Sequence, residues 1–198
     1  MRVNYVKSAR KAKGERKCGR CGKAIEVGMA YRYAEPRYGP KMIRCAECPT
    51  FRPSELTGSK IATAYAAQEA AEDTLNGLDL TVDTESDDDE HEHREPSEVA
   101  DDVQALVDDI KAALEECADG AEECRDDYQD GFDSMPEGLQ QGDTGQQVEE
   151  RIDALDTWAD ELRGFDPDGW DPDEGTSPDD YLQDVLSEAI DLVNNLEV

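Results

Sequence analysis

Residues 18–48 read CGRCGKAIEVGMAYRYAEPRYGPKMIRCAEC and contain two Cys-x-x-Cys pairs, which are separated by 23 residues. The two-residue gap within each pair lets both thiolates reach one cation, and two pairs complete a tetrahedral shell of four sulfurs. Such a shell suits Zn²⁺, with Zn–S bonds of about 2.3 Å. The sequence therefore predicts a zinc site at Cys18, Cys21, Cys45 and Cys48.

The interval between the two pairs is typical of short strands. Segments rich in β-forming residues, at 24–27, 29–34 and 41–44, are interrupted by glycine and proline. A β-hairpin fills such an interval, so we expect a small zinc ribbon. Because four thiolates leave no coordination position for water, the metal is expected to be structural and to stabilise a module too small to fold on its core alone.

Two other uses of paired cysteines remain as alternatives. A redox dithiol needs one Cys-x-x-Cys at a helix start and gives no reason for a second pair. An iron–sulfur cluster also takes four thiolates, but its usual spacings differ from the spacing here. We therefore favour zinc as the cofactor.

Charge divides the chain into two parts. The 198 residues include 20 Lys and Arg against 50 Asp and Glu, a net charge of −30. Residues 1–60 hold 15 basic and 5 acidic side chains, whereas residues 61–198 hold 5 basic and 45 acidic ones. Net charges of +10 and −40 suggest two modules with different partners. The acidity has two explanations that the sequence leaves open, adaptation to concentrated salt and a surface that imitates nucleic acid.

Basic side chains and aromatic rings are interleaved around the cysteines, as in proteins that contact phosphates with cations and stack bases on rings. Strand residues Arg32, Tyr33 and Arg37 are expected to face the ligand. The full set of candidate nucleic-acid-binding residues is Lys11, Lys13, Arg20, Arg32, Tyr33, Arg37, Lys41 and Arg44. The alternative is that the tyrosines form the core of the ribbon and the basic residues pair with the acidic helices of the same chain.

Composition and periodicity predict an α+β fold that is mostly α. A basic zinc-ribbon module is followed by an Ala-rich helix, an acidic disordered linker and an acidic helical hairpin or three-helix bundle. The corresponding ranges are 1–56, 57–80, 81–96 and 97–198, with helices at about 97–134, 144–163 and 178–196. Residues 1–17 show no apolar periodicity and are expected to form a flexible basic arm.

The clearest periodicity lies in residues 97–134, where apolar residues recur at alternating steps of mostly four and three. This seam predicts a long helix packed on another helix. Its members are Val99, Val103, Leu106, Ile110, Ala113, Cys117, Ala121, Cys124 and Tyr128. The two cysteines of the seam are expected to be small buried apolar residues. Gly120 is expected to allow a bend or a close approach.

Helix starts are predicted from their capping residues. Ser97 after Pro96 is an expected N-cap, Thr144 with Gln147 matches a capping box, and Ser177 precedes a proline at the first position of the last helix.

Two further groups have ligand-type side chains but a simpler interpretation. His91 and His93 lie in the acidic linker and are expected to be solvated. The repeat FDPDG and WDPDEG at 165–175 offers four aspartates, Asp166, Asp168, Asp171 and Asp173, but its spacing does not match a calcium-binding loop. We expect turns whose aromatic residues fold back onto the helices.

Several classes of protein are not expected. No apolar run approaches the roughly 20 residues of a membrane-spanning helix, and the start of the chain does not match a secretion signal. No phosphate-binding loop and no motif for a Ser or Cys nucleophile is present, so an enzyme is not expected.

At RYGPKMIRCAEC (37–48), FRPSELTGSKIATAYAAQEAAED (51–73) and SMPEGLQQGDTGQQVEERIDALDTWADELR (134–163), the sequence resembles small uncharacterised proteins of tailed bacteriophages and haloarchaeal viruses. The resemblance implies an N-terminal zinc ribbon joined to a helical hairpin, with the four cysteines as metal ligands, and a viral or proviral origin. It implies no particular activity.

Two functional classes follow as expectations. The first is a nucleic-acid-binding accessory or regulatory factor, whose helices serve dimerisation or recruitment. The alternative is a structural or protein-interaction protein, which includes a protein of the virion. In this alternative zinc only stabilises the fold, and the helical hairpin docks on a partner. Either is expected in the cytoplasm of the host cell or in the virion.

Overall fold

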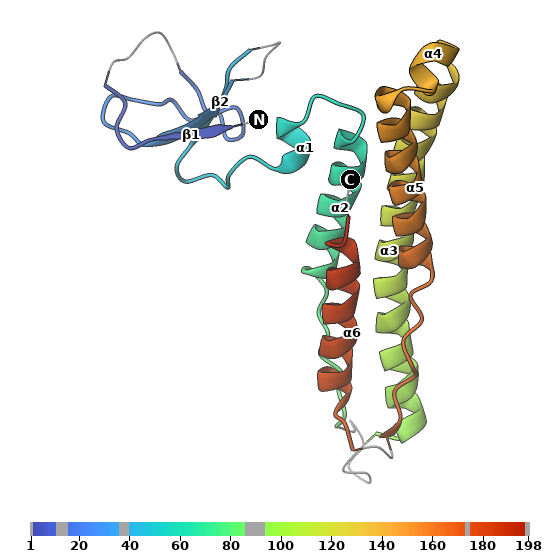
Figure 1. Ribbon diagram of the computed structural model, residues 1–198. Helices are drawn as coiled ribbons and strands as arrows, with labels where there is room; N and C mark the ends of the chain where they lie inside the picture. Colours follow the sequence, from blue (N-terminus) through green and yellow to red (C-terminus); the bar gives the residue numbers. More distant parts are fainter. Residues whose placement is uncertain (1, 11–15, 36–39, 86–93, 173–174, 197–198) are drawn as a thin grey trace. The chain divides into compact units, whose positions relative to one another are not determined.

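The computed structural model describes residues 2–10, 16–35, 40–85, 94–172 and 175–196. The chain divides into two compact units, Met1–Ala62 and Thr63–Val198. The first unit contains a small antiparallel sheet and the second is helical (Figure 1). The fold is therefore α+β and mostly helical, as the sequence predicts.

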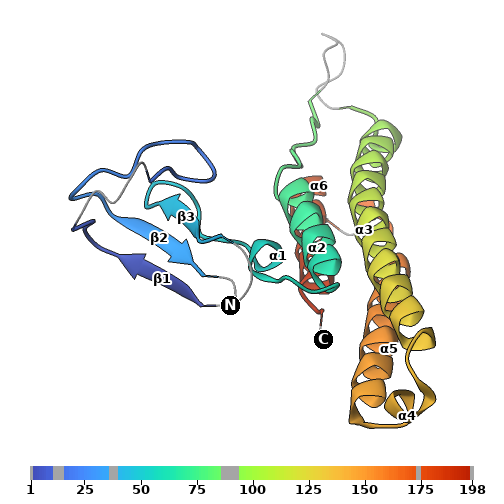
Figure 2. The same ribbon diagram turned by 90° about the horizontal axis from the view of Figure 1, so that it is seen from above.

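Three short strands form the sheet, in the order β1-β2-β3 (Figure 2). They are β1 (Val3–Val6), β2 (Tyr31–Ala34) and β3 (Met42–Cys45). The register places Tyr5 opposite Arg32, and Arg32 opposite Arg44.

Two expectations about this unit are wrong. The arm at 1–17 is not uniformly flexible, because its residues 3–6 form the edge strand β1. This strand is only four residues long and pairs with a segment far along the chain, so it leaves little local signal. The segment 24–27 is not a strand and contributes one isolated bridge, between Lys17 and Ala24.

The sheet has two different faces because side chains alternate along each strand. On one face Tyr31 and Cys45 are buried with Ala9, Cys18 and Ile25 in a small core. On the other face Ala34 and Arg44 are buried. The chain after Cys48 approaches this second face, where Phe51 lies under the Arg44 guanidinium at 4.6 Å, and it continues into α1 (Pro53–Leu56).

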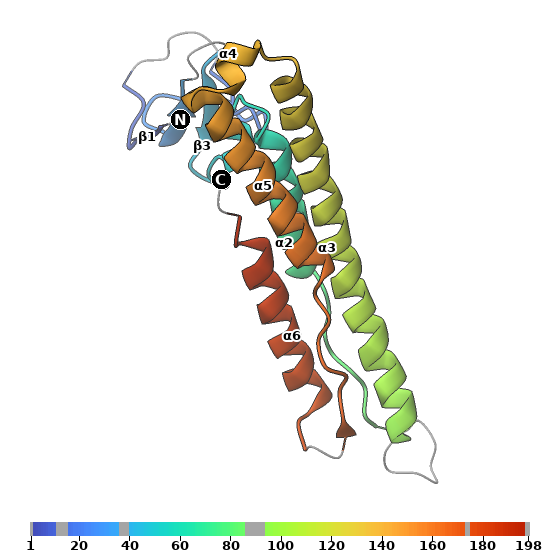
Figure 3. The same cartoon turned by 45° about the vertical axis from the view of Figure 1, so that its right-hand side comes forward.

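The second unit is built on one long helix. Its elements are α2 (Ala62–Leu75), α3 (Pro96–Asp133), α4 (Glu137–Gln140), α5 (Asp143–Arg163) and α6 (Pro178–Val193). Helix α3 contacts both α5 and α6, and α5 runs back alongside α3 (Figures 1 and 3). The seam of α3 is buried as predicted except that Val107 replaces Leu106, which is half-buried. Cys117 and Cys124 are 1% and 0% exposed, and burial raises the pKa of Cys117 to about 12.

Two of the three predicted helix caps are wrong. Helix α3 begins one residue early, with Glu95 as N-cap, because Pro96 itself occupies a first-turn position. Helix α5 has Gly142 as N-cap and no side-chain cap, so the expected Thr144 box does not form. Ser177 does cap α6, since its Oγ accepts from the Asp180 N–H at 3.1 Å.

The Ala-rich helix α2 belongs to the helical unit. A Cβ on Gly120 would lie 2.3 Å from the Ala67 Cβ, so the missing side chain lets α2 and α3 come together. Gln68 Nε2 donates to the Val193 carbonyl oxygen at the end of α6, at 3.0 Å. The Trp158 Nε1–H of α5 donates to the Leu192 carbonyl oxygen, also at 3.0 Å. Two side chains from different helices thus bind the last carbonyls of α6.

The acidic linker is not featureless at its start. Val82 is 8% exposed, and its N–H donates to Asp179 Oδ1 of α6 at 3.1 Å. This contact corrects the expectation of disorder for residues 81–85. His91 and His93 lie outside the described residues.

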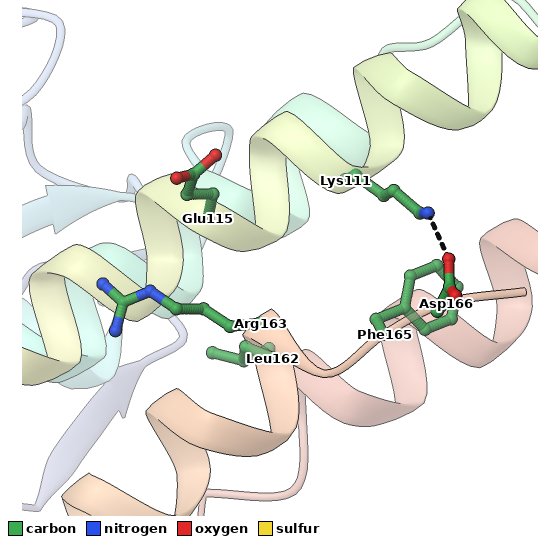
Figure 4. A pocket seen from close by; sticks show the side chains of 6 residues that line it. All are labelled: Lys111, Glu115, Leu162, Arg163, Phe165 and Asp166. Atoms are coloured by element: carbon green, nitrogen blue, oxygen red, sulfur yellow. Dashed lines mark hydrogen bonds and ion pairs between the residues drawn. The ribbon is translucent and has the colours of Figure 1, made fainter.

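The five basic residues of the helical unit each contact another segment or helix. Arg163 of α5 pairs with Asp119 of α3 at 2.7 Å. Figure 4 shows the pair between Lys111 of α3 and Asp166 after α5, at 2.6 Å. Arg125 reaches Asp156, Arg94 reaches Asp102, and Arg151 lies 5.8 Å from the centre of the Tyr128 ring.

The aspartate repeat behaves in part as predicted. Phe165 is buried against the helices, and Asp166 is used in the Lys111 ion pair. Trp170 is only half-buried, and its Nε1–H donates to the Thr176 carbonyl oxygen within the same loop.

None of the helices in the described ranges is both long enough and apolar enough to cross a bilayer.

The close approach at Gly120 generates a first prediction. Alanine is a better helix former by about 1 kcal/mol, yet we expect Gly120→Ala to lower the free energy of unfolding by about 1–3 kcal/mol, because its Cβ would overlap the Ala67 Cβ. Urea unfolding followed by circular dichroism measures the difference. Gly138→Ala in α4 is the matched control, since no atom lies within 4 Å of its added Cβ, and it is expected to be neutral or stabilising.

The charge of the helical unit generates a second prediction. With 45 acidic residues against 5 basic ones, mutual repulsion outweighs the few ion pairs. We therefore expect the thermal midpoint of the helical unit to rise between about 0.1 M and 1 M NaCl, as screening shortens from about 10 Å to about 3 Å. Stability that falls with added salt would mean that the ion pairs dominate.

Candidate metal centre

The first cysteine pair lies at the tip of a narrow loop. The bridge between Lys17 and Ala24 closes the loop, and the Cys18 N–H donates to the Lys23 carbonyl oxygen at 2.8 Å. The Gly22 N–H donates back to the Cys18 carbonyl oxygen at 2.9 Å, with Gly22 at φ +71°. Since side chains rarely adopt this left-handed conformation, glycine after the second cysteine allows the turn.

The second pair begins at the end of β3 and is tied to the first by the backbone. Cys45 is the last residue of β3, and Cys48 follows it after a tight turn. The Gly19 N–H donates to the Ile43 carbonyl oxygen at 2.8 Å. Lys23 and Glu47 add an ion pair of 2.7 Å between the two turns. Because both side chains are well exposed, this pair contributes little to stability and mainly orients the loops.

The four sulfur atoms converge on one point. All lie within 4.8 Å of one another, with Cys18 Sγ 3.8 Å from Cys48 Sγ and Cys21 Sγ 3.7 Å from Cys45 Sγ. A tetrahedron with metal–sulfur bonds of about 2.3 Å has edges of about 3.8 Å. A disulfide requires about 2.05 Å, so none of these contacts is one. The sulfurs are therefore spaced as for a single tetrahedral ion.

The thiols differ in how readily they ionise. Burial alone would raise the pKa of Cys18, but hydrogen bonds from the backbone N–H groups of Cys21, Cys45 and Arg20 outweigh it and lower the pKa to about 6. Hydrogen bonding to Cys45, together with burial, raises the pKa of Cys48 to about 12. Without a cation, one thiolate forms easily and suppresses the next. A divalent cation removes this repulsion, and the donor set therefore fits a thiophilic metal.

The centre sits at the edge of the small core. Cys18 and Cys45 are 2% and 4% exposed, whereas Cys21 is exposed. A metal bound here would hold the Cys18 loop against β3. A metal held by all four sulfurs would have no open coordination position, so its role would be structural.

Arg44 does not occupy the position expected of a phosphate contact. It is 5% exposed, and Nη1 donates to the Thr50 carbonyl oxygen at 2.8 Å and to Glu55 Oε2 at 3.1 Å. Burial alone would raise the pKa of Glu55, but the hydrogen bonds from Arg44 and Arg52 and the charges of Arg44 and Arg20 lower it. Arg44 is thus part of the structure that joins β3 to α1.

Arg32 and Tyr33 cannot face one ligand together, because neighbours on a strand point to opposite faces. Tyr33 packs against the small core, and Lys41 Nζ lies 3.3 Å from the centre of its ring. Arg32 is on the other face, where Nη1 donates to the Cys48 carbonyl oxygen at 2.9 Å. Arg32 therefore supports the second cysteine turn.

The remaining candidates are placed differently. Lys41 pairs with Glu35 at 2.7 Å, and Arg20 is exposed beside Cys21. Lys11, Lys13 and Arg37 lie outside the described residues.

Sequence reasoning missed three features of this unit. The Arg44–Glu55 pair is one, although an acid three residues after Arg52 is placed to accept the Arg52 backbone N–H, which it does at 2.8 Å. The Lys23–Glu47 pair is another, and the sequence indicates it by placing opposite charges next to the two cysteine pairs. Tyr5 was overlooked because its segment was assigned to a flexible arm.

Comparison of the chain with protein-family models, curated protein sequences and solved structures finds no match. The site and the charges around it therefore carry the indications of function.

The centre generates a third prediction. We expect the purified protein to bind one Co²⁺ or Zn²⁺ per chain, and Cys21→Ser to weaken and shift the thiolate-to-cobalt absorption bands because one of four thiolates is lost. Cys124→Ala is the matched control, since Cys124 is buried in α3 and should leave the metal stoichiometry at one. Equal cobalt spectra for Cys21→Ser and the unmodified protein would contradict the assignment.

Proposed function

We propose that Met1–Ala62 is a zinc ribbon whose four cysteines hold a structural Zn²⁺. The sulfur–sulfur distances of 3.7 and 3.8 Å and the all-thiolate donor set support this identification. The metal would connect the two cysteine turns, and with them β3 and the small core. In this proposal the helical unit is an acidic bundle that works as a separate interaction module.

We propose further that the protein is a non-enzymatic, nucleic-acid-binding accessory or regulatory factor of viral or proviral origin. The observation that carries the proposal is the charge of the first unit, which has 15 basic and 5 acidic residues in a chain with a net charge of −30. Arg2, Lys7, Arg10 and Arg20 are exposed on it. A concentration of cations on one small unit attracts phosphate backbones.

The helical unit has a consequence for this activity. The helical unit carries a net charge of −40 and repels nucleic acid. Because it belongs to the same chain, it also competes with nucleic acid for the basic unit. Affinity for nucleic acid would then depend on whether the acidic helices are engaged elsewhere, for instance by a protein partner or a second copy of the chain.

A second candidate function has an observation in its favour. Arg32, Lys41 and Arg44 are all engaged inside the first unit, with backbone carbonyls or carboxylates. This arrangement favours a protein in which zinc only stabilises the fold and the helices dock on a protein partner, including one in a virion.

A fourth prediction separates the two candidates. We expect residues 1–62 to bind DNA or RNA in a gel shift at about 0.05 M salt, and to bind much more weakly at about 0.2 M, because each phosphate contact releases counterions. The full chain is expected to bind more weakly than residues 1–62 under the same conditions. Residues 63–198 serve as the control and should not bind.

Two results would contradict this proposal. If residues 1–62 retain zinc but bind neither DNA nor RNA at low salt, the protein-interaction function is favoured. If the full chain and residues 1–62 bind equally well, the acidic helices do not compete.

A further inference from the structure

Tyr5 is a large aromatic side chain on the surface of the basic unit. It lies on the edge strand β1, with 56% of its surface exposed. The two tyrosines of β2 pack inward instead. Tyr31 is buried in the small core, and Tyr33 packs against it. The exposure of Tyr5 is therefore not explained by the packing of the sheet.

The guanidinium of Arg32 lies over the Tyr5 ring. The two residues are opposite one another in the β1–β2 register, and the guanidinium carbon lies 5.8 Å from the ring centre. Arg32 is fixed in turn by its 2.9 Å hydrogen bond to the Cys48 carbonyl oxygen. The metal-binding turn thus supports Arg32, and Arg32 lies over one face of the ring. More than half of the Tyr5 surface stays exposed beside this contact.

Cations flank β1, and the carboxylate of Glu55 on this face of the sheet is paired with Arg44. Arg2 and Lys7 flank β1 and are exposed. Arg20 lies near enough to the Glu55 carboxylate to interact with it, and Glu55 pairs with Arg44 on the same face of the sheet as Arg32. An exposed ring bordered by cations suits a ligand that combines flat aromatic groups with negative charge.

Resting on the proposed nucleic-acid binding, we propose that Tyr5, backed by Arg32, is a stacking platform for an unpaired base, and that the protein prefers single-stranded over double-stranded nucleic acid. In a duplex the bases are stacked on each other and only the backbone and groove edges are offered, whereas a single strand presents base faces. Stacking is tolerant of sequence because every base has a flat face. Tyr5 takes the role first expected of Tyr33, whose ring is covered by Lys41.

The test uses the full-length zinc-loaded protein and fluorescence anisotropy. The probes are labelled oligo(dT) of about 16 nucleotides and the same strand paired with oligo(dA). We expect the unmodified protein to bind the single strand more tightly than the duplex. Tyr5→Ala should weaken single-strand binding by about 5- to 100-fold and change duplex binding little, while Tyr5→Phe, which keeps the ring, should bind like the unmodified protein.

A matched control tests for general effects of surface changes. Val27 is 60% exposed in the same unit, and Val27→Ala also removes an exposed apolar side chain without changing charge. It should leave both affinities unchanged, and a cobalt spectrum should show that every variant keeps its metal centre.

The outcomes separate this inference from the proposed function. If the unmodified protein binds both probes and Tyr5→Ala binds the single strand equally well, the stacking platform is wrong and nucleic-acid binding stands. If Tyr5→Ala lowers the affinity for both probes equally, Tyr5 does not act by stacking on an unpaired base. If neither the unmodified protein nor residues 1–62 bind either probe, both proposals fail.

Discussion

Four thiol groups within 4.8 Å of one another impose the constraint on which the first unit depends. Like charges this close repel, so the four thiols cannot all ionise side by side unless a cation lies between them. A metal that resolves the conflict connects a loop near the start of the chain to the end of β3. In the part of the chain that the structure describes, the sheet of this unit is small, with three strands of four residues. Metal binding and folding should therefore be one process.

The two units use charge in opposite ways. In the first unit several cations, notably Arg32 and Arg44, are committed to internal hydrogen bonds, and others remain at the surface. In the second unit basic residues such as Arg163 join different segments, and the excess of carboxylates covers the exterior. Opposite charges give the two units opposite electrostatic preferences, so under the proposed function each unit affects what the other attracts.

Features that depend on local spacing could be predicted from the sequence. The two-residue gaps identified the four converging cysteines, and the periodicity of residues 97–134 identified the buried side of α3, including Cys117 and Cys124. Features that depend on distant pairing could not. Strand β1 forms only because β2 is available to pair with it, and Arg44 is buried because Glu55 and Phe51 fold back onto it. The missed cap at Gly142 has a local origin instead, because α4 packs so closely against the start of α5 that a Cβ on Gly145 would meet the Gln140 backbone.

The identity of the ligands around the metal is the most direct test of this account. X-ray absorption at the zinc edge of the purified protein measures both the kind and the distance of the coordinating atoms. Four sulfur atoms at about 2.3 Å, with no nitrogen or oxygen in the first shell, are the predicted result. A folded, metal-free protein with four reduced cysteines, or a shell that includes oxygen or nitrogen, would contradict it.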